Sequence, residues 1–194
     1  MVGGKGTPST TKFVTQNFSS KSTFTYVELG IYEGMTAQSI AENFPHAQIA
    51  LFDYAENIAR AQENLHTYGK RIQYFSNSQK YLDSYCWTLA KYCENKKPFI
   101  DYCFIDGPHT FAIDALAFFI VDKYLKIGGY IDFDDYSWTL KNSSLDPIKV
   151  PETSLLYTDE QIESRQVQMI VDMFVKNNTS YKEIVKNKIY KKIN

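Results

Sequence analysis

The sequence Thr25-Tyr-Val-Glu-Leu-Gly-Ile-Tyr-Glu-Gly34 decides the fold, because an apolar segment leads directly into a turn that carries two glycines. Tyr26, Val27 and Leu29 have the side chains of a buried strand. Glycine lets the backbone turn sharply and lets a ligand approach without meeting a Cβ atom. The segment therefore predicts a strand that ends in a tight turn.

The residues after this turn predict a helix. Apolar side chains recur there at i, i+3, i+4 and i+7, namely at Ala37, Ile40, Ala41 and Phe44. The order strand, glycine turn, helix is typical of open α/β sheets, in which nucleotide-like ligands bind beyond the carboxyl ends of the strands.

Length and composition indicate a single domain with one sizeable core, since the chain has 194 residues and 44% hydrophobic content. Its 21 Lys and Arg residues nearly balance 22 Asp and Glu residues, which leaves a formal net charge of −1. This balance argues against nucleic acid or an anionic membrane as a partner. No apolar run reaches the roughly 20 residues of a membrane span.

The three cysteines, Cys86, Cys93 and Cys103, lack the spacing of a metal site. An odd number of such residues is typical of buried thiols in a reducing compartment. The N-terminus also lacks the apolar core of a signal peptide. We therefore expect a cytoplasmic protein.

Strand-like and helix-like segments alternate along the chain. Strands are expected at residues 25–29, 48–53, 71–76, 99–106 and 130–135, and helices at 35–44, 56–68, 77–92 and 111–125. This alternation predicts an α/β fold with a doubly wound, mostly parallel sheet. Residues 181–185 and 188–193 add an antiparallel C-terminal hairpin, which makes seven strands in all.

The remaining segments define the domain organisation. Residues 1–21 are rich in Gly, Ser and Thr and predict a flexible N-terminal arm, followed by one domain over residues 22–194. Residues 137–157 have no steady period, and a loop this long is often functional. Thr158 and Gln161 form a capping-box pattern that predicts the start of a last helix.

The residues at the carboxyl ends of the predicted parallel strands are mostly polar, and they should meet at one edge of the sheet. They are Glu28, Gly30, Asp53, Asn77, Asp106, His109, Asp134 and Asp135. Asp53, about 20 residues beyond the glycine turn, is placed to accept hydrogen bonds from a ribose. The alternative is that Asp53 only caps the next helix.

Several of these segments carry a family resemblance. Residues 27–34 (VELGIYEG) resemble the S-adenosylmethionine-binding motif of class I methyltransferases. Residues 104–111 (FIDGPHTF) and 125–136 (LKIGGYIDFDDY) are similar to later motifs of the small-molecule O-methyltransferases of the macrocin and catechol type. The resemblance covers most of residues 25–136 and implies a Rossmann-like fold.

The resemblance implies S-adenosylmethionine as the cofactor. Glu28 and the turn at Gly30 would hold its amino-acid end, Asp53 its ribose, and Asn77 with Ser78 its adenine. This family usually has an acidic residue beside the adenine, so Asn77 departs from its pattern. The complete set of expected cofactor-binding residues is Glu28, Gly30, Tyr32, Gly34, Asp53, Asn77, Ser78 and Asp106.

The catechol-type relatives also imply a metal and a base. Asp106, Asp134 and Asp135 match the positions of three Mg²⁺ ligands, and oxygen-only ligands suit Mg²⁺. His109 and Asp106 are the expected catalytic residues, with His109 as general base. Two alternatives stay open: His109 as a structural residue, and Asp132 or Asp135 paired with nearby lysines instead of a metal.

The sequence leaves the acceptor and two rival functions open. A small-molecule hydroxyl, on a sugar or other polyol, is the expected acceptor, with Tyr136 and Trp138 as candidate walls of its pocket. A nicotinamide-dependent oxidoreductase would favour a Gly-x-Gly-x-x-Gly turn, which this chain lacks. A non-catalytic partner subunit and a homo-oligomer also fit the sequence.

Overall fold

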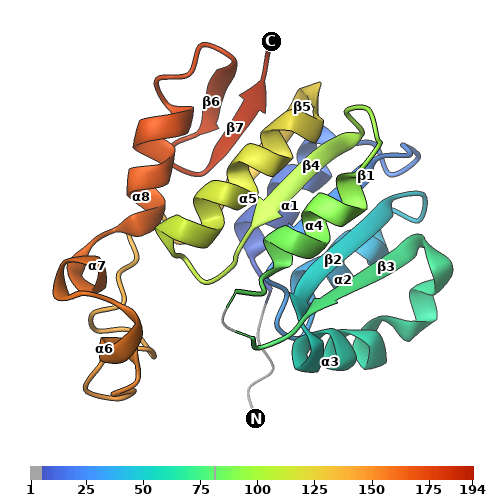
Figure 1. Cartoon of the computed structure of the whole chain (residues 1–194). Helices are drawn as coiled ribbons and strands as arrows, with labels where there is room; N and C mark the ends of the chain where they lie inside the picture. Colours follow the sequence, from blue (N-terminus) through green and yellow to red (C-terminus); the bar gives the residue numbers. More distant parts are fainter. Residues whose placement is uncertain (1–5, 81) are drawn as a thin grey trace.

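A seven-stranded sheet forms the centre of the protein, in the order β3-β2-β1-β4-β5-β7-β6 (Figure 1). The structure is a computed structural model that describes residues 6–80 and 82–194. The strands are β1 (Thr25–Leu29), β2 (Gln48–Tyr54), β3 (Ile72–Asn77), β4 (Ile100–Ile105), β5 (Leu125–Phe133), β6 (Tyr181–Val185) and β7 (Ile189–Lys192). The first five are parallel, and β7 pairs antiparallel with β5 and β6. The predicted doubly wound α/β fold with its terminal hairpin is confirmed.

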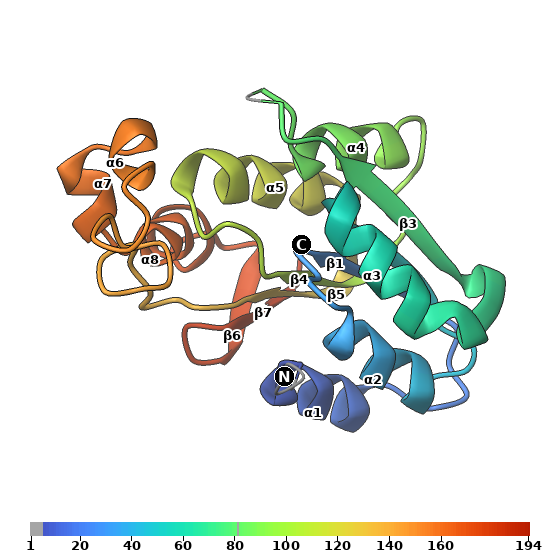
Figure 2. The ribbon, with the colours of Figure 1, turned by 90° about the horizontal axis from the view of Figure 1, so that it is seen from below.

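Helices cover both faces of the sheet (Figure 2). The side chains of α1, α2 and α3 enter one buried cluster, and those of α4, α5 and α8 enter the other. The helical segments are α1 (Pro8–Asn17), α2 (Met35–Asn43), α3 (Ala55–Leu65), η1 (His66–Arg71), α4 (Tyr85–Cys93), α5 (Phe111–Tyr124), α6 (Thr153–Leu156), α7 (Asp159–Glu163), α8 (Gln166–Ile170) and the π-helical turn η2 (Val171–Val175). None within the described part of the chain is long and apolar enough to cross a bilayer.

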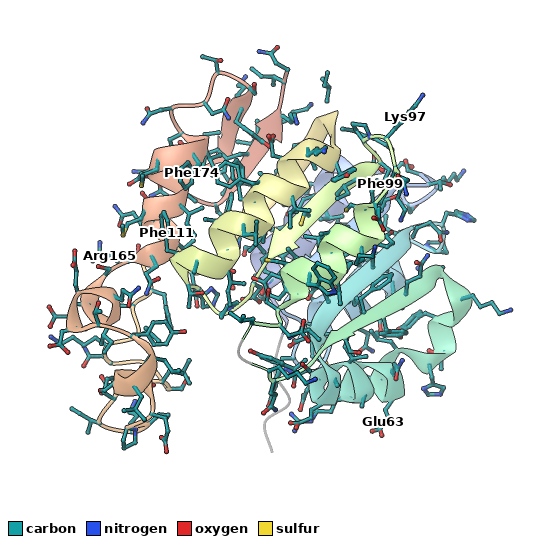
Figure 3. All side chains as sticks on the ribbon, in the orientation of Figure 1. Glu63, Lys97, Phe99, Phe111, Arg165 and Phe174 are labelled. Carbon is teal, nitrogen blue, oxygen red and sulfur yellow. The ribbon has the colours of Figure 1, made fainter. Side chains whose placement is uncertain are left out.

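Aromatic and aliphatic side chains join these layers. The ring centroids of Phe111 on α5 and Phe174 on η2 lie 6.0 Å apart, and Figure 3 shows these side chains in the region where the two helical segments meet. On the opposite face Ala37, Ile40 and Ala41 of α2 are buried, as their helical spacing predicts. Both faces of the sheet are therefore packed, which accounts for strands that are apolar on successive residues.

The turn after β1 is fixed by a close approach of two loops. Gly30 has φ +83°, and a Cβ atom placed on it would lie 2.0 Å from the carbonyl oxygen of Asp106. Gly34, with φ +78°, precedes the first residue of α2. Glycine is therefore required at position 30 because the loop after β4 passes directly over it, whether or not a ligand is bound.

The N-terminal segment corrects the sequence prediction of a flexible arm over residues 1–21. Pro8–Asn17 forms helix α1, in which Thr10, Phe13 and Val14 are buried. Residues 1–5 of the predicted arm lie outside the described residues. The helix is short and rich in threonine, so its periodicity is weak, although proline at its first position favours a helix start.

Three other element boundaries differ from the sequence predictions. The helix expected at 77–92 begins only at Tyr85, because the Ser84 side chain caps it by accepting from the Cys86 backbone N–H. Strand β5 begins at Leu125, five residues before the expected start at Tyr130, and includes Gly128 and Gly129. The last helix is divided after Glu163, although its predicted capping box is present.

The three thiols follow the sequence prediction. Cys86 and Cys93 are both buried on α4, and Cys103 is buried on β4. All three are free.

A buried carboxylate ties together distant parts of the chain. Asp132, in β5, is 0% exposed. Its Oδ2 atom accepts hydrogen bonds from the hydroxyls of Thr10 in α1 (2.7 Å) and Tyr102 in β4 (2.6 Å). Its Oδ1 atom lies 3.0 Å from Nζ of Lys188, in the turn between β6 and β7. A buried carboxylate needs such partners, because its desolvation is costly.

Gly30→Ala should destabilise the protein more than Gly128→Ala. Both glycines have positive φ, but a Cβ atom would meet nothing within 4 Å at Gly128. We expect a loss of about 1–2 kcal/mol in the free energy of unfolding for Gly128→Ala, and about 2 kcal/mol more for Gly30→Ala, from overpacking. Urea denaturation measures both, and equal losses would contradict the close approach.

Candidate functional site

A cavity with a volume of about 620 Å³ lies at the carboxyl ends of the parallel strands. Of the residues expected from the sequence, its lining contains Glu28, Gly30, Tyr32, Asp53, Asn77 and Asp106. The structure therefore brings most of the expected cofactor-binding residues to one space. Gly34, Ser78, His109, Asp134 and Asp135 are not part of this lining.

Asp53 holds the turn after β1 in place. Its Oδ2 atom accepts hydrogen bonds from the backbone N–H groups of Ile31 (2.7 Å) and Tyr32 (2.9 Å). Its Oδ1 atom accepts from the Tyr54 backbone (2.6 Å) and from Nδ2 of Asn57 (3.0 Å). The carboxylate thus orients the turn after β1 and contacts the start of α3, and its role toward a ribose stays a prediction.

Asn77 presents an unused acceptor within the cavity wall. The residue is 5% exposed, and its Oδ1 atom has no hydrogen-bond partner among the described residues. Ser78 is engaged elsewhere, because its N–H and hydroxyl both donate to Oδ2 of Asp83 at 2.7 Å. A buried amide oxygen without a partner is costly, so a ligand that donates a hydrogen bond would stabilise it.

Glu28 is a buried acid next to the turn. Its Oε2 atom accepts a hydrogen bond from the Tyr26 hydroxyl at 2.8 Å. Burial raises the pKa of Glu28 to about 8; the Tyr26 hydrogen bond opposes this rise, and the negative charge of Asp53 adds to it. The side chain is therefore mostly protonated at neutral pH.

His109 lies between two of the expected acidic residues. Its Nε2 atom is 3.7 Å from Oδ1 of Asp106 and 3.5 Å from Oδ2 of Asp135. Burial lowers the pKa of His109 below its ordinary value of 6.5, although Asp135 and Asp134 act in the opposite direction. Burial also raises the pKa of Asp106 to about 9, with further contributions from the charges of Asp134 and Glu28. A neutral imidazole next to acidic groups can accept a proton.

The backbone near this histidine is strained. His109 has φ +56° and Asp135 has φ +52°, a region that non-glycine residues rarely adopt. Asp114 supports the loop, because its backbone N–H donates to the carbonyl oxygen of Thr110 at 2.9 Å and its side chain accepts a hydrogen bond from the Tyr85 hydroxyl. Strain of this kind persists only where surrounding contacts impose it, and it is common at functional sites.

The expected magnesium ligands do not form a metal-binding group. Within residues 6–80 and 82–194, no three or more His, Cys, Asp or Glu side chains are arranged to hold a metal ion. Asp134 Oδ1 lies 2.9 Å from Nζ of Lys188, and Asp106 and Asp135 both lie close to His109. The present donor set therefore does not fit the ion. Of the two residues expected to pair with a lysine instead, Asp132 lies 3.0 Å from Nζ of Lys188, and Asp135 lies near His109.

Some residues that line the cavity were not predicted from the sequence. Gly6 and Thr7 line it from before α1, Tyr85 lines it from α4, and Leu145 and Tyr157 line it from the long segment after β5. A Cβ atom on Gly107 would lie 2.1 Å from the Tyr85 hydroxyl, which itself donates to Asp114. Only the glycine in FIDGPHTF could have indicated this contact, and only with the partner helix known.

The two aromatic residues expected at an acceptor pocket have different contacts. The ring centroids of Trp138 and His109 are 5.1 Å apart in an edge-to-face arrangement. The Tyr136 hydroxyl instead donates to Asp172 at 2.8 Å and accepts from Nζ of Lys176 at 2.6 Å. Tyr136 therefore anchors the loop to η2, while Trp138 lies beside the candidate base.

The strand order, the glycine turn after β1 and the carboxylate at the end of β2 define an α/β protein of the kind that binds nucleotide-like cofactors at its strand ends. The chain belongs to a methyltransferase family, because residues 27–136 match the family described as "Methyltransferase domain". The resemblance noted in the sequence is confirmed at this level, and the macrocin or catechol branch stays a prediction.

Sequence comparison also finds a viral relative. Uncharacterized protein R132 of Acanthamoeba polyphaga mimivirus is 29% identical over 126 residues, which cover 62% of this chain and 55% of that protein. The chain thus spans about half the length of that relative.

Solved structures that match this chain over nearly its whole length include two O-methyltransferases. One is an O-methyltransferase from Bacillus cereus, solved in complex with SAH, which is 14% identical to this chain and superposes with a TM-score of 0.63. The match covers 97% of this chain and 82% of the Bacillus cereus chain. The O-methyltransferase TomG from Streptomyces achromogenes, involved in tomaymycin synthesis and solved in complex with SAM, has 12% identity, 97% and 81% coverage, and a TM-score of 0.62. At these identities the likeness is one of fold.

Glu28→Gln should flatten the dependence of stability on pH. The pKa of Glu28 in the folded protein, about 8, exceeds its ordinary value of 4.5. The unfolded state therefore releases this proton first, and stability falls as pH rises from 4.5 to 8, by an amount on the order of 4 kcal/mol. Urea denaturation across this range should show a smaller fall for Glu28→Gln and no change for exposed Glu63→Gln. Parallel curves for all three proteins would contradict the assignment.

Proposed function

We propose that this protein transfers a methyl group from S-adenosylmethionine to a hydroxyl group of a small molecule. The observation that carries the proposal is the cavity at the strand ends, where the turn after β1, Asp53 and Asn77 line a single space. Membership of a methyltransferase family supports it. The fold is also that of two O-methyltransferases solved with SAH or SAM.

The charge of the cavity suits a cationic cofactor. Glu28, Asp53 and Asp106 all line it, and burial together with mutual repulsion raises the pKa of Glu28 to about 8 and of Asp106 to about 9. S-adenosylmethionine has positive charges on its sulfonium and its ammonium group. Positive charges near Glu28 and Asp106 would lower these raised pKa values and favour the carboxylate forms, which then pair with the cofactor. We assign the amino-acid end of the cofactor to Glu28 and the turn at Gly30.

Asp53 and Asn77 are assigned to the nucleoside end. Asp53 ends β2, and its carboxylate lies against the turn after β1 through Ile31 and Tyr32. Ribose hydroxyls would donate to this carboxylate. The unpartnered Oδ1 atom of Asn77 fits the amino group of a neutral adenine. These residues satisfy the main hydrogen-bonding needs of an adenosine.

His109 is assigned as the general base. When bound, S-adenosylmethionine supplies an electrophilic methyl group on its sulfonium sulfur. Nε2 of His109 takes the proton of the acceptor hydroxyl, and the carboxylate of Asp135, 3.5 Å away, stabilises the resulting imidazolium. The burial that lowers the pKa of His109 keeps the ring neutral before transfer.

We propose a sugar or another polyol as the acceptor. Trp138 lies beside His109, and an aromatic ring at this point can stack on the apolar face of a sugar. Leu145 and Tyr157, from the segment after β5, add apolar and aromatic surface to the cavity wall.

Calorimetric titration with S-adenosylhomocysteine tests the cofactor assignment. Asp53→Ala should weaken binding about 10- to 100-fold, because a charged hydrogen-bond acceptor is lost, and Asn77→Ala about 5- to 10-fold. Exposed Asn43→Ala serves as the control and should bind as the unmodified protein does. NAD should not bind; binding of NAD with no response to S-adenosylhomocysteine would overturn the proposal.

His109→Gln tests the base. The change should lower kcat about 10²- to 10⁴-fold on any accepted sugar or catechol, while the affinity for S-adenosylhomocysteine stays the same. Release of S-adenosylhomocysteine from a panel of such acceptors measures the rate. An unchanged kcat would remove His109 from the mechanism.

A further inference from the structure

The acidic end of β5 already contains a positive charge. Nζ of Lys188 lies 3.0 Å from Oδ1 of Asp132 and 2.9 Å from Oδ1 of Asp134. The ammonium group also lies 5.1 Å from the centre of the Phe104 ring. The Lys188 side chain is only 17% exposed, so its ion pairs are weakly screened by solvent.

Backbone contacts also hold Lys188 in place. The carbonyl oxygen of Lys188 accepts a hydrogen bond from the Phe133 N–H at 2.9 Å. The next residue, Ile189, is in register with Asp132 across the β5–β7 pair. The hairpin therefore positions the ammonium group at the carboxyl end of β5, next to Asp134.

A divalent cation would compete with this ammonium group for the same oxygen. Mg²⁺ requires oxygen ligands at about 2.0–2.1 Å in octahedral geometry. Asp134 Oδ1 is instead bound to an amine, and Asp106 and Asp135 lie near the imidazole of His109. The three carboxylates thus already have basic nitrogen atoms as neighbours.

We propose that Lys188 takes the place of the divalent cation in this protein, so that its ammonium group neutralises the acidic edge and methyl transfer needs no metal. This inference rests on the proposed function. In the transfer, the acceptor oxygen forms a bond to the methyl carbon and the carbon–sulfur bond breaks with its electron pair retained by sulfur. The acceptor proton moves to Nε2 of His109. Lys188 is a positioning residue, because it acts through Asp132 and Asp134.

Binding of Mn²⁺, followed by electron paramagnetic resonance in the presence of S-adenosylhomocysteine, tests the inference directly. The unmodified protein and Lys188→Arg, which keeps the charge, should bind no Mn²⁺ at millimolar concentration. Lys188→Met removes the ion pairs of Asp132 and Asp134 and should gain Mn²⁺ binding. Binding of Mn²⁺ to the unmodified protein that is lost in Asp134→Asn would overturn the inference.

Thermal unfolding gives a second readout. Lys188→Met should lower Tm by about 6–12 °C, because a buried ion pair is broken, and Mn²⁺ should restore part of this loss. Lys186→Met removes an exposed charge from the same turn and should leave Tm and Mn²⁺ binding unchanged. A Lys188→Met protein as stable as the unmodified one and without Mn²⁺ binding would contradict the inference.

The two readouts separate this inference from the proposed function. If S-adenosylhomocysteine binds and Mn²⁺ also binds at Asp134, only the inference fails. If S-adenosylhomocysteine does not bind, the proposed function fails and the inference fails with it. Should Lys188→Met not fold, the titrations of the unmodified protein and of Asp134→Asn still decide the question.

Discussion

The carboxylate of Asp132 is the constraint on which the arrangement of the sheet's C-terminal half depends. It is fully buried, and its partners Thr10, Tyr102 and Lys188 come from α1, β4 and the turn before β7. A buried carboxylate without partners would be strongly destabilising. The packing of α1 is therefore linked energetically to the β4–β5 pair and to the terminal hairpin. Lys188 also forms an ion pair with Asp134 at the edge of the site.

The sequence predicted those parts of the fold that depend on the local periodicity of apolar residues. The strand, turn and helix around Gly30 and the alternation of strands and helices are confirmed, since each depends on neighbouring residues. Helix α1 was missed because its burial depends on Phe13 and Val14 reaching a distant part of the sheet. Strand β5 begins earlier than its apolar run predicts. Gly128 and Gly129 lie in it between Leu125, which pairs with Ile100, and Tyr130, which pairs with Tyr102, and such an irregular pairing is not visible in the local sequence.

The candidate site also contains residues that the sequence predicts and residues that it does not. Residues at strand ends, such as Asp53 and Asn77, were predictable because parallel strands end at one edge. Residues that reach the cavity through tertiary packing, such as Tyr85 and Tyr157, were not. The role of Lys188 was also hidden, because its two acidic partners lie more than 50 residues away in the sequence and a lysine-rich hairpin is equally typical of an exposed sheet edge.

The contacts of Asp132 also bear on how the protein folds. Its bond to Tyr102 spans 30 residues, but its bond to Thr10 spans 122. Closing a loop of that length costs conformational entropy before any contact compensates for it, and folding slows as native contacts become more distant in sequence. We expect the β4–β5 pair to form early, with α1 and the hairpin joining it afterwards. Until they do, this carboxylate stays hydrated, and the acidic edge of the sheet is assembled among the last parts of the molecule.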